Sequence, residues 1–461
     1  MRIPAVVVLV ASCASPDAAD REQRIVTSLA DDNYLWALRD PALVERKLAK
    51  MQRGPYEWLR GTANLFWRDV MEPGAQRTAS AFGDPASSRV LLVGDPHPEN
   101  AGTFRAADGT MIVDWNDFDS TGYGPFTGDL RRLGAGLVIA AEDPALGGEL
   151  VRRAATGYAM QIAAIASGQP TGPAIAGAHP LLDDELATAK TRGDRSYALD
   201  ELAPATNGVR AVAFGDLEPV AADGVYEDRV TPVAPEVADW IDRAIAQWRL
   251  GTLDAAAAVV KLRARRVGSG VSSYAAYRFN VVLEGATPAV DDDLLIEIKE
   301  TREGVIVRGL PRWSAAEWDS PAARAVATQR RLQARPDADP LLGHALVGGL
   351  SLKLRHREAY QRGLDRDDLT ALATGSTADR ARLGDLAEIY GEMLARAHGQ
   401  ARTEDGVLGA TVIAPLLAGR DAAFVDDIVQ LATQDAAQVI ADHALMKDRE
   451  LFPLIFPEVL P

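Results

Sequence analysis

Apolar residues recur at helical spacing in several long stretches of the chain, and this periodicity predicts helices. Between residues 33 and 70, for example, Leu43, Val44, Leu48 and Met51 fall on one face of such a helix. The same pattern predicts further helices over residues 130–141, 150–166, 321–334, 386–397 and 424–432, and another that starts near residue 236. Helices are therefore expected to dominate the first and the last parts of the chain.

Short apolar runs that end in polar residues predict strands. Residues 89–94 lead directly into Asp95, and residues 110–115 end in Asp-Trp, so each strand delivers a carboxylate near its C-terminal end. Two more runs, residues 279–283 and 294–299, predict strands in the second half. Glycine, proline, serine and acidic residues predict loops and an irregular connector, at residues 73–88, 168–180 and 200–235.

Length and composition indicate a folded body of two or three domains, or of one large two-lobed domain. The chain has 461 residues, of which 47% are hydrophobic and 25% charged, close to globular averages. Its 49 Lys and Arg residues against 65 Asp and Glu residues give a net charge of −16, which repels phosphate backbones, so no nucleic-acid partner is expected. A single cysteine excludes internal disulfides and cysteine-rich zinc sites.

The N-terminus resembles a short bacterial signal peptide. Met1 to Cys13 combine one basic residue with an apolar run, and Val10-Ala11-Ser12-Cys13 resembles a lipobox in which Cys13 is lipidated. This interpretation predicts a protein anchored by lipid on the periplasmic side of the cell envelope. The alternatives are a hydrophobic strand or a misassigned start, and they predict a cytoplasmic protein. No run of about 18 apolar residues occurs later in the chain, so no membrane span is predicted there.

Three oxygen-bearing side chains in the most polar segment are candidate metal ligands. Asp95 and Asn100 lie in one loop stiffened by prolines, and Asp114 follows near the end of the next predicted strand. Hard oxygen donors that converge on one point suit Mg²⁺, which binds through one or two carboxylates together with substrate phosphates. The structural alternative is an Asx-turn and a helix cap. The neighbouring acids favour a metal-assisted phosphoryl-transfer site.

This loop resembles the catalytic loops of two related enzyme families. Asp95-Pro-His-Pro-Glu-Asn100 is similar to the D-x-K-P-E-N loop of protein kinases. With Gly94 included, it is closer to the G-D-x-H-x-x-N loop of aminoglycoside phosphotransferases. The resemblance implies that Asp95 is the catalytic base and that Asn100 binds Mg²⁺.

Two later phrases extend the resemblance to these families. Ile112-Val-Asp-Trp115 resembles their I-D-W metal-binding turn, and Gly124 to Leu130 resembles their G-x-x-x-x-D-L segment. The first implies that Asp114 is the other Mg²⁺ ligand. The second implies that Asp129 braces the catalytic loop from the following helix.

A longer pattern resembles the bacterial domain of unknown function family 2252 over most of the chain. The matching phrases are Lys50 to Gly61, the catalytic-like loop, Asn116-Asp-Phe-Asp119, Gly268-Ser-Gly270, Ile298-Lys-Glu300 and Leu394-Ala-Arg-Ala-His398. This resemblance implies a consistent set of positions, and it implies no particular reaction.

The nucleotide-binding parts that the kinase resemblance implies come late in the chain. Gly268, Ser269 and Gly270 precede an extended stretch, and Lys299 is placed like the lysine of the kinase V-A-I-K strand. Met393 to His398 resembles the helix that leads into a kinase catalytic loop. Read cyclically, the parts occur in kinase order, so we expect a circularly permuted kinase-like fold.

The resemblance thus implies an α+β fold with two lobes, a helix-rich large lobe and a small β-containing lobe. The expected divisions are a signal peptide at 1–13, a linker at 14–32, the catalytic-loop part of the large lobe at 33–235, a small nucleotide-binding-like lobe at 236–365, and C-terminal helices that complete the large lobe at 366–461.

Two residues depart from the kinase pattern at the implied nucleotide-binding site. Ser273 stands at the third glycine of a G-x-G-x-x-G loop, and strand alternation places Glu297 on the face of Lys299, where kinases carry a small residue against adenine. The same alternation places Glu300 on the opposite face. The acid partner of Lys299 stays open, with Glu317 and Gln329 as candidates.

Several further polar residues are expected either to support the site or to play a purely structural role. His97 either binds a ligand or locks the loop by a hydrogen bond, and Arg60 either clamps phosphate or pairs with an acid. The same choice applies to Arg131 and Arg132. Residues 116–119, which follow the second predicted strand, are called the acidic turn below. In this turn, Asn116, Asp117 and Asp119 either support the site or bind a second metal.

The sequence therefore predicts a Mg²⁺-dependent phosphotransferase that uses ATP and an unknown hydroxyl acceptor, either a small molecule or a protein. Nucleotidyl transfer is the nearest variant. A noncatalytic envelope lipoprotein that binds a ligand on the same fold is the alternative. One geometric prediction follows: the carboxylate of Asp114 and the amine of Lys299 should face one cleft.

Overall fold

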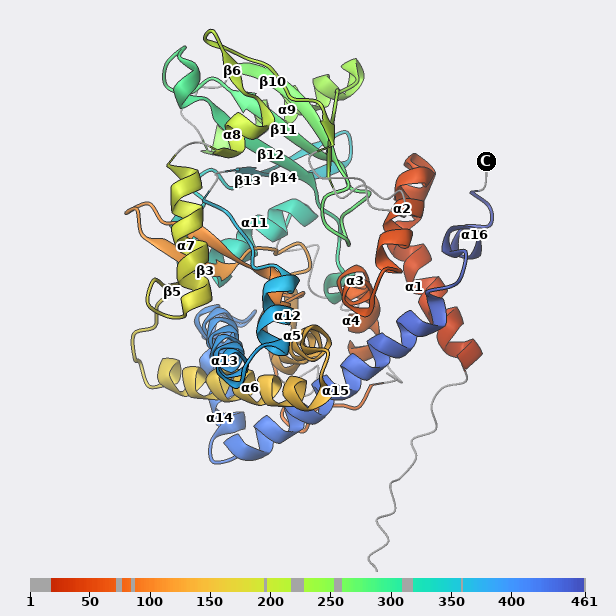
Figure 1. Ribbon diagram of the computed structural model, residues 1–461, viewed down its shortest axis with the longest axis vertical. Coiled ribbons are helices and arrows are strands. Elements are labelled where there is room, and N and C mark those ends of the chain that lie inside the picture. Colours follow the sequence, from red (N-terminus) through yellow and green to blue (C-terminus); the bar gives the residue numbers. More distant parts are fainter. Residues whose placement is uncertain are drawn as a thin grey trace, which may run out of the picture.

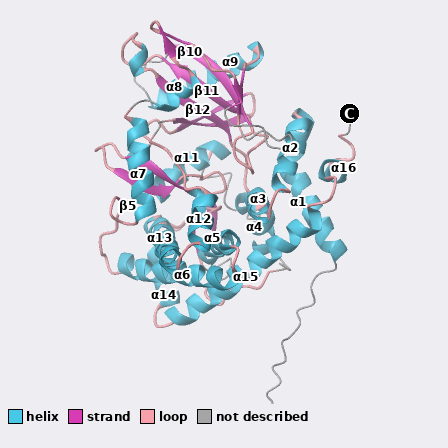
Figure 2. Cartoon of the chain, in the orientation of Figure 1, coloured by secondary structure: helices cyan, strands magenta, loops and turns pink. Residues whose placement is uncertain are grey.

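The computed structural model describes residues 18–71, 77–83, 88–194, 197–216, 228–252, 259–308, 318–357 and 360–459. Cys13, with the rest of the signal-like segment, and Glu317 lie outside these ranges. The structure is a mixture of helices and antiparallel sheets, with the largest sheet at one end and most helices at the other (Figures 1 and 2).

Most of the helices belong to one packed body. They are α1 (Ala18–Arg39), α2 (Pro41–Met51), α3 (Pro55–Gly61), α4 (Ala63–Met71), α5 (Phe126–Ala141), α6 (Pro144–Ala166), α12 (Arg366–Thr374), α13 (Thr377–Gln400), α14 (Gly409–Leu417), α15 (Asp421–Met446) and α16 (Leu451–Ile455). Three further helices contact the large sheet, namely α8 (Tyr197–Leu202), α9 (Pro235–Thr252) and α11 (Pro321–Leu332). Helix α7 (Pro180–Gly193) packs against the small sheet of β2 (Ala101–Arg105) and β3 (Met111–Trp115), and the short α10 (Val305–Arg308) packs against α4 and β4 (Gly122–Pro125).

Helix α5 is the centre of the helical body. All of its residues are buried, because α6, α12 and α15 pack around it. A helix that is buried on every side is stable only when neighbours cover every side. The polar residues Asp129, Arg131 and Arg132 of α5 therefore need partners inside the protein, and these partners define much of the site below.

The two ends of the described chain pack together. Arg21 of α1 forms ion pairs with Asp69 of α4 and Asp442 of α15, with N–O distances of 2.8 and 2.5 Å. All three side chains are buried. Buried ion pairs of this kind fix relative placement, since an unpaired partner would be costly.

The largest sheet has seven strands in the order β13-β14-β12-β11-β10-β9-β8, and its pairings are antiparallel. Its strands are β8 (Gly215–Asp216), β9 (Arg229–Thr231), β10 (Val260–Val267), β11 (Arg278–Leu283), β12 (Leu294–Glu300), β13 (Gly343–Val347) and β14 (Leu350–His356). Helix α11 lies between β12 and β13 in the chain and packs against β13 and β14.

Alternation along β12 gives the large sheet two different faces. Ile296 and Ile298 pack with Ile241 and Trp248 of α9, so one face is apolar and covered by that helix. On the opposite face, Leu295 packs beneath α8 in a separate apolar cluster. The charged residues of that second face are left to border a cavity.

Two small sheets position the polar loops. Strand β1 (Arg89–Leu92) pairs with β4 (Gly122–Pro125), and β2 (Ala101–Arg105) pairs with β3 (Met111–Trp115), to which the short β5 (Ala174–Ile175) adds. A further short pair joins β6 (Ala205–Thr206) to β7 (Val209–Arg210). The loop from β1 to β2 and the turn from β3 to β4 therefore lie close together.

The helices and strands expected from periodicity are present, and the strand boundaries differ by one or two residues. Several helices are longer than expected: α13 begins nine residues before the expected 386, and α15 ends 14 residues after the expected 432. The connector at 200–235 is only partly irregular, because its described part contains β6 to β9. Helix α7, which the sequence did not predict, presents only three buried side chains, Leu182, Leu186 and Ala189. Across the described ranges, no helix has the length and apolar character needed to cross a bilayer.

Candidate functional site

The loop between β1 and β2 is held in place by Asp129 of α5. The backbone N–H groups of Val93 and Gly94 donate to the Asp129 carboxylate at 2.8 and 3.1 Å. Gly94 has φ of +91°, and a Cβ there would lie 2.2 Å from the carbonyl oxygen of Ser120. Only glycine fits such a position without strain. Asp129 thus makes the bracing contact that the resemblance implies.

Asp95 follows Gly94 and is held by an arginine. Nε of Arg132 donates to Oδ1 of Asp95 at 2.8 Å, and the guanidinium also donates to the carbonyl of Leu59. Burial raises the pKa of Asp95, while the Arg132 guanidinium opposes that shift and the carboxylate of Asp117 adds to it. Asp95 is therefore a positioned carboxylate whose charge is sensitive to its neighbours.

Asn100 closes the loop and connects it to the acidic turn. Its Nδ2 donates to the backbone carbonyl of Asp95 at 2.8 Å, so the amide oxygen remains for another partner. Its own carbonyl accepts a hydrogen bond from the backbone N–H of Asn116. The loop of Asp95 and Asn100 is therefore joined by this hydrogen bond to residues 116–119.

The acidic turn meets the large sheet through Lys299. Its ammonium lies 2.5 Å from the carboxylate of Asp119 and 3.6 Å from that of Asp117. Lys353 of β14 binds the same Asp119 at 2.7 Å. Two lysines lower the pKa of Asp119 against the opposing effect of burial. The acid partner of Lys299 is thus Asp119, whereas the candidate Gln329 bonds to Gln333.

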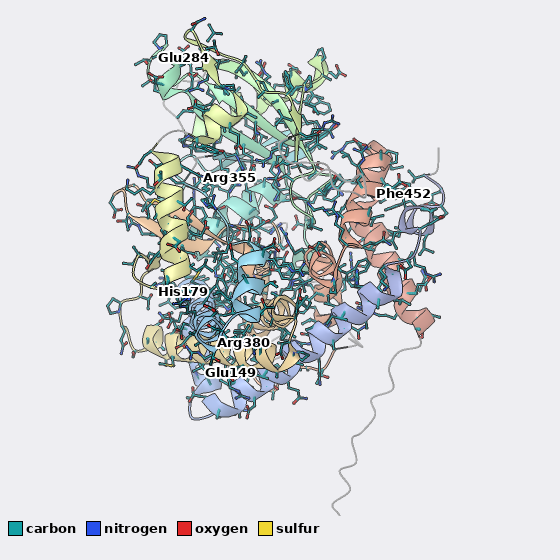
Figure 3. All side chains as sticks on the ribbon, in the orientation of Figure 1. Glu149, His179, Glu284, Arg355, Arg380 and Phe452 are labelled. Atoms are coloured by element: carbon teal, nitrogen blue, oxygen red, sulfur yellow. The ribbon has the colours of Figure 1, made fainter. Side chains whose placement is uncertain are left out.

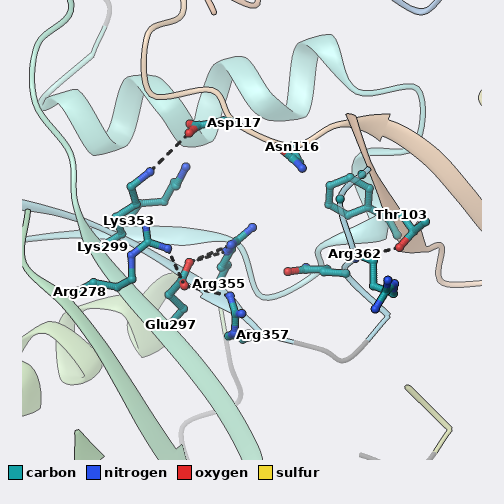
Figure 4. A pocket seen from close by; sticks show the side chains of 14 residues that line it. Thr103, Asn116, Asp117, Arg278, Glu297, Lys299, Lys353, Arg355, Arg357 and Arg362 are labelled. Atoms are coloured by element: carbon teal, nitrogen blue, oxygen red, sulfur yellow. Dashed lines mark hydrogen bonds and ion pairs between the residues drawn. The ribbon is translucent and has the colours of Figure 1, made fainter. Parts of the chain in front are cut away.

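A cavity of about 170 Å³ lies beside this contact, on the charged face of the sheet. Figure 4 shows Asn116 and Asp117 on one side of it, Arg362 on another, and Glu297 among several arginines below. Arg355 stands on β14, at the side of the sheet that faces the helices (Figure 3). The described lining of the cavity is Gly102, Thr103, Phe104, Asn116, Asp117, Arg278, Glu297, Lys299, Lys353, Arg355, Arg357, Gln361, Arg362 and Gly363.

Glu297 lies on the same face as Lys299, as alternation predicted, and it is buried. It accepts hydrogen bonds from Arg278, Arg355 and Arg357 at 3.1, 2.9 and 3.2 Å. Burial is the largest single influence and acts to raise the pKa of Glu297, but the guanidinium groups together outweigh it and hold that pKa well below the usual range for a glutamate. A charged cluster therefore occupies the position at which the sequence resemblance implies a small residue against adenine.

The loop between β10 and β11 carries the two predicted glycines. Gly268 and Gly270 have φ of +92° and +79°, so both need the left-handed conformation that glycine allows. Residues 268–270 are not among the described residues that line the 170 Å³ cavity. Instead, Ser272 and Ser273 of the same loop border a second cavity of about 80 Å³, together with Asp119.

The prediction that Asp114 faces the cleft of Lys299 is wrong. Asp114 is fully buried, and its carboxylate accepts from the backbone N–H groups of Trp115 and Ala334 at 2.9 and 2.8 Å. Arg396 of α13 pairs with it at 3.1 Å. These partners occupy both oxygens, so Asp117 is the acid of this segment that lines the cavity.

The other supporting residues lie away from the cavity, and most of them have structural partners. Arg60 pairs with Glu99 at 2.5 Å, and Arg131 pairs with Asp435 at 2.7 Å. His97 is buried with Nδ1 unpaired, and burial lowers its pKa well below the usual range for a histidine. His398 bonds to both Asp129 and Tyr158. None of these four lines the 170 Å³ cavity.

Apart from Lys299, the basic residues that line the cavity were not predicted from the sequence. Lys353, Arg355 and Arg357 alternate along and just beyond β14, so their side chains fall on one face. That alternation was the available signal. Arg278 gave no such signal, because its neighbours in the cavity come from β12 and β14.

The oxygen donors of the site suit a hard divalent cation. Within the described ranges, no three His, Cys, Asp or Glu side chains gather in a way that would hold a metal by themselves. Mg²⁺ does not require such a cage, because it binds through one or two carboxylates, substrate phosphates and water. Asp117, with a side chain 39% exposed, and the amide oxygen of Asn100 are donors of the right kind.

One family matches nearly the whole chain. It is described as an uncharacterized protein conserved in bacteria, DUF2252, and its match covers residues 39–449. Comparison with the curated proteins and with the solved structures finds no match.

Proposed function

The chain belongs to the DUF2252 family of uncharacterized bacterial proteins, and on that premise we propose that it is a kinase-like, Mg²⁺-dependent phosphotransferase. The observation that carries the proposal is the approach of Lys299 to Asp117 and Asp119, next to a loop that presents Asp95. A lysine on a strand, an acidic metal-binding turn and an aspartate base are the parts that kinases assemble for phosphoryl transfer.

The order of parts around the large sheet supports the same proposal. Strands β10 and β11 flank a glycine-containing turn, β12 carries Lys299, and helix α11 follows β12. Protein kinases place their glycine-rich loop, lysine strand and αC helix in this sequence. Here the loop that carries Asp95 precedes these parts in the chain, which is the basis for proposing a circular permutation of a two-lobed kinase-like fold.

Each residue of the site has a chemical role in this proposal. Asp95 orients an acceptor hydroxyl and takes its proton, while the acceptor oxygen forms a bond to the transferred phosphorus and the bond to the leaving phosphate breaks. Lys299 and Lys353 place positive charge beside the transferred phosphoryl group. Arg132 holds Asp95 in position from the buried helix α5.

Mg²⁺ would be held by Asp117 and Asn100, and Asp117 replaces Asp114 in the assignment from sequence. Held there, Mg²⁺ would supply positive charge next to the donor phosphates. The electrostatic effect of Asp117 on Asp95 indicates that two carboxylates lie near each other, an arrangement that a cation would relieve. The phosphate donor implied by the kinase resemblance is ATP, but the charged lining around Glu297 offers its adenine no apolar wall.

The test is Mg²⁺-dependent phosphoryl transfer by the full chain, measured by release of labelled phosphate and by transfer to a panel of hydroxyl compounds. Asp95→Asn should lower turnover about 10²- to 10⁴-fold while leaving donor binding unchanged. Turnover of the wild type should fall with decreasing pH as Asp95 is protonated, because burial raises the pKa of Asp95 above that of an ordinary aspartate. Asp385→Asn, at an exposed ion pair with Arg153, is the matched control.

Equal turnover in Asp95→Asn and wild type would overturn the assignment of Asp95. A chelator that leaves turnover unchanged would overturn the assignment of Mg²⁺. If the nucleotide part of a donor is transferred and pyrophosphate is released, the activity is nucleotidyl transfer on the same site.

The second candidate is a noncatalytic binding protein of the cell envelope, anchored through Cys13. Its support is that Lys299 and Lys353 are both held by Asp119, which makes the cationic face rigid without any bound donor. Metabolic labelling with a fatty acid that depends on Cys13, together with ligand binding and no turnover, would favour it. An unprocessed N-terminus in the cytoplasm would favour the enzyme.

A further inference from the structure

The cavity on the charged face of the large sheet does not suit a nucleobase. Phe104 is the one apolar side chain among its described lining residues, apart from glycines. Sites for aromatic ligands are mostly lined by apolar and aromatic side chains and usually exceed about 300 Å³. This cavity measures about 170 Å³ and is bordered by guanidinium and ammonium groups. Its chemistry is that of an anion site.

The strand register brings like charges directly opposite one another. Arg278 of β11 lies opposite Lys299 of β12, and Lys299 lies opposite Lys353 of β14. Like charges in cross-strand pairs destabilise a sheet. A row of three cations across three neighbouring strands therefore calls for anions on that face, and all three residues line the cavity.

Cations predominate among the described residues that line the cavity. Six of these residues are cations, namely Arg278, Lys299, Lys353, Arg355, Arg357 and Arg362, and two are acids, Asp117 and Glu297. Asp119, Glu185 and Asp339 lie outside the lining and also act on these cations. The described wall of the cavity is therefore mainly cationic, although the whole chain has a net charge of −16.

Arg357 shows the effect of crowding cations on this face. Repulsion from Arg266, followed by burial, lowers the pKa of Arg357 to about 9. Arginine keeps its charge far above this range when an acid balances it. Glu297, its acid partner at 3.2 Å, is shared with Arg278 and Arg355. An incoming anion would relieve this repulsion.

We propose that this cavity binds a compact oligophosphate, such as pyrophosphate or tripolyphosphate, through its phosphate groups and without recognising a nucleobase. Arginine pairs with phosphate in bidentate geometry, and several guanidinium groups converge here with two lysines. Asp117, at the rim, is placed to share a divalent cation with such a ligand. The inference rests on the proposed function, because the cavity is its donor site, and it replaces ATP as the donor.

The experiment is isothermal titration of the full chain with tripolyphosphate, ATP, adenosine and citrate, each with and without Mg²⁺. Tripolyphosphate should bind, ATP should bind no more tightly, and adenosine and citrate should not bind. Arg357→Met should weaken tripolyphosphate binding at least tenfold, because it removes a charged hydrogen-bond donor from the cavity. Arg263→Met, on β10 and paired with Asp242, is the matched control and should bind as the wild type does.

A second variant separates binding from folding. Glu297→Gln removes the acid that competes with the ligand, so it should tighten tripolyphosphate binding and enlarge the thermal shift that the ligand causes. Tighter binding of ATP than of tripolyphosphate, or any binding of adenosine, would overturn the inference. Equal binding of citrate would overturn it by showing an unspecific anion site, and so would no binding of tripolyphosphate. Binding without turnover would leave this inference standing and contradict only the proposed phosphotransferase activity.

Discussion

Nε2 of His398 lies 3.0 Å from Oδ2 of Asp129, although 269 positions separate them in the chain. Both side chains are fully buried, and Nδ1 of His398 bonds to the hydroxyl of Tyr158 at 2.9 Å. The C-terminal helix α13 is thereby connected, through one carboxylate of α5, to the backbone of Val93 and Gly94.

Asp129→Ala should therefore destabilise the protein strongly. It leaves the N–H groups of Val93 and Gly94 buried without an acceptor, and each unsatisfied donor costs about 1 to 3 kcal/mol. Tyr158→Phe removes only the outer hydrogen bond of the network and should cost about 0.5 to 1.5 kcal/mol. Urea unfolding measures both. A loss for Asp129→Ala no larger than that for Tyr158→Phe would show that the loop does not depend on this carboxylate.

Asp114 and Asp117 should respond differently to the same substitution. Asp114→Asn breaks a buried pair with Arg396 and should lower the free energy of unfolding by about 3 to 5 kcal/mol. Asp117→Asn acts on a side chain 39% exposed and should change stability by less than about 1 kcal/mol. It should, however, abolish the effect of Mg²⁺ on ligand binding. Retained Mg²⁺ dependence in Asp117→Asn would contradict its role as a metal ligand.

Lys47 should make stability depend on pH. It is buried, and burial lowers its pKa from 10.5 to about 7. Between these values the unfolded chain binds a proton that the folded protein lacks, so the free energy of unfolding rises with pH across that window. Below pH 7, burying the charged lysine costs roughly 4 to 5 kcal/mol, because each tenfold change in proton affinity corresponds to about 1.4 kcal/mol.

Lys47→Met should therefore stabilise the protein most at pH 6, with an advantage over the wild type that shrinks as the pH approaches 10. Loss of the hydrogen bond to Asn33 adds an offset that does not vary with pH. Lys190→Met, at an exposed pair with Asp194, is the control and should differ little from wild type at any pH. A pH-independent difference between Lys47→Met and wild type would refute the lowered pKa of Lys47.

Alanine substitutions at Gly94 and Gly168 can be compared to measure how tightly the loop that carries Asp95 is packed. Both have a positive φ, but an added Cβ meets nothing within 4 Å at Gly168 and the Ser120 carbonyl at 2.2 Å at Gly94. Gly168→Ala should cost about 1 to 2 kcal/mol from conformation alone. Gly94→Ala should cost about 1 to 3 kcal/mol more, because the backbone must shift. Thermal unfolding would measure the difference, and equal costs would mean that the loop moves freely.

Periodicity predicted most of the helices and strands, because burial of one face repeats regularly along each of them. The residues of the site were harder to place. The segment after β3 offers several acids and amides within a few positions, and only the fold decides which of them turn outward. Asp114 was chosen from its motif, yet Arg396 and the N–H of Ala334, which occupy it, lie 282 and 220 positions away.

The basic cavity was hidden for a related reason. Arg278, Lys299 and Lys353 are neighbours only because three strands pair in one register, and a shift of one residue would send each side chain to the opposite face. Alternation on a single strand is visible in a sequence, whereas register between strands is not. The sequence showed that Glu297 departs from the kinase pattern. Only the structure shows that three arginines bind this carboxylate.

The pairing of Arg21 with Asp69 and Asp442 limits how the polypeptide can be shortened for experiments. A truncation before α15 would strip a buried guanidinium of one of its two carboxylates and uncover apolar side chains of α1 and α2. Fragments designed to isolate the sheet and its cavity should therefore retain α1 together with α15 and α16, and deletion series should trim from within surface loops instead of from either end.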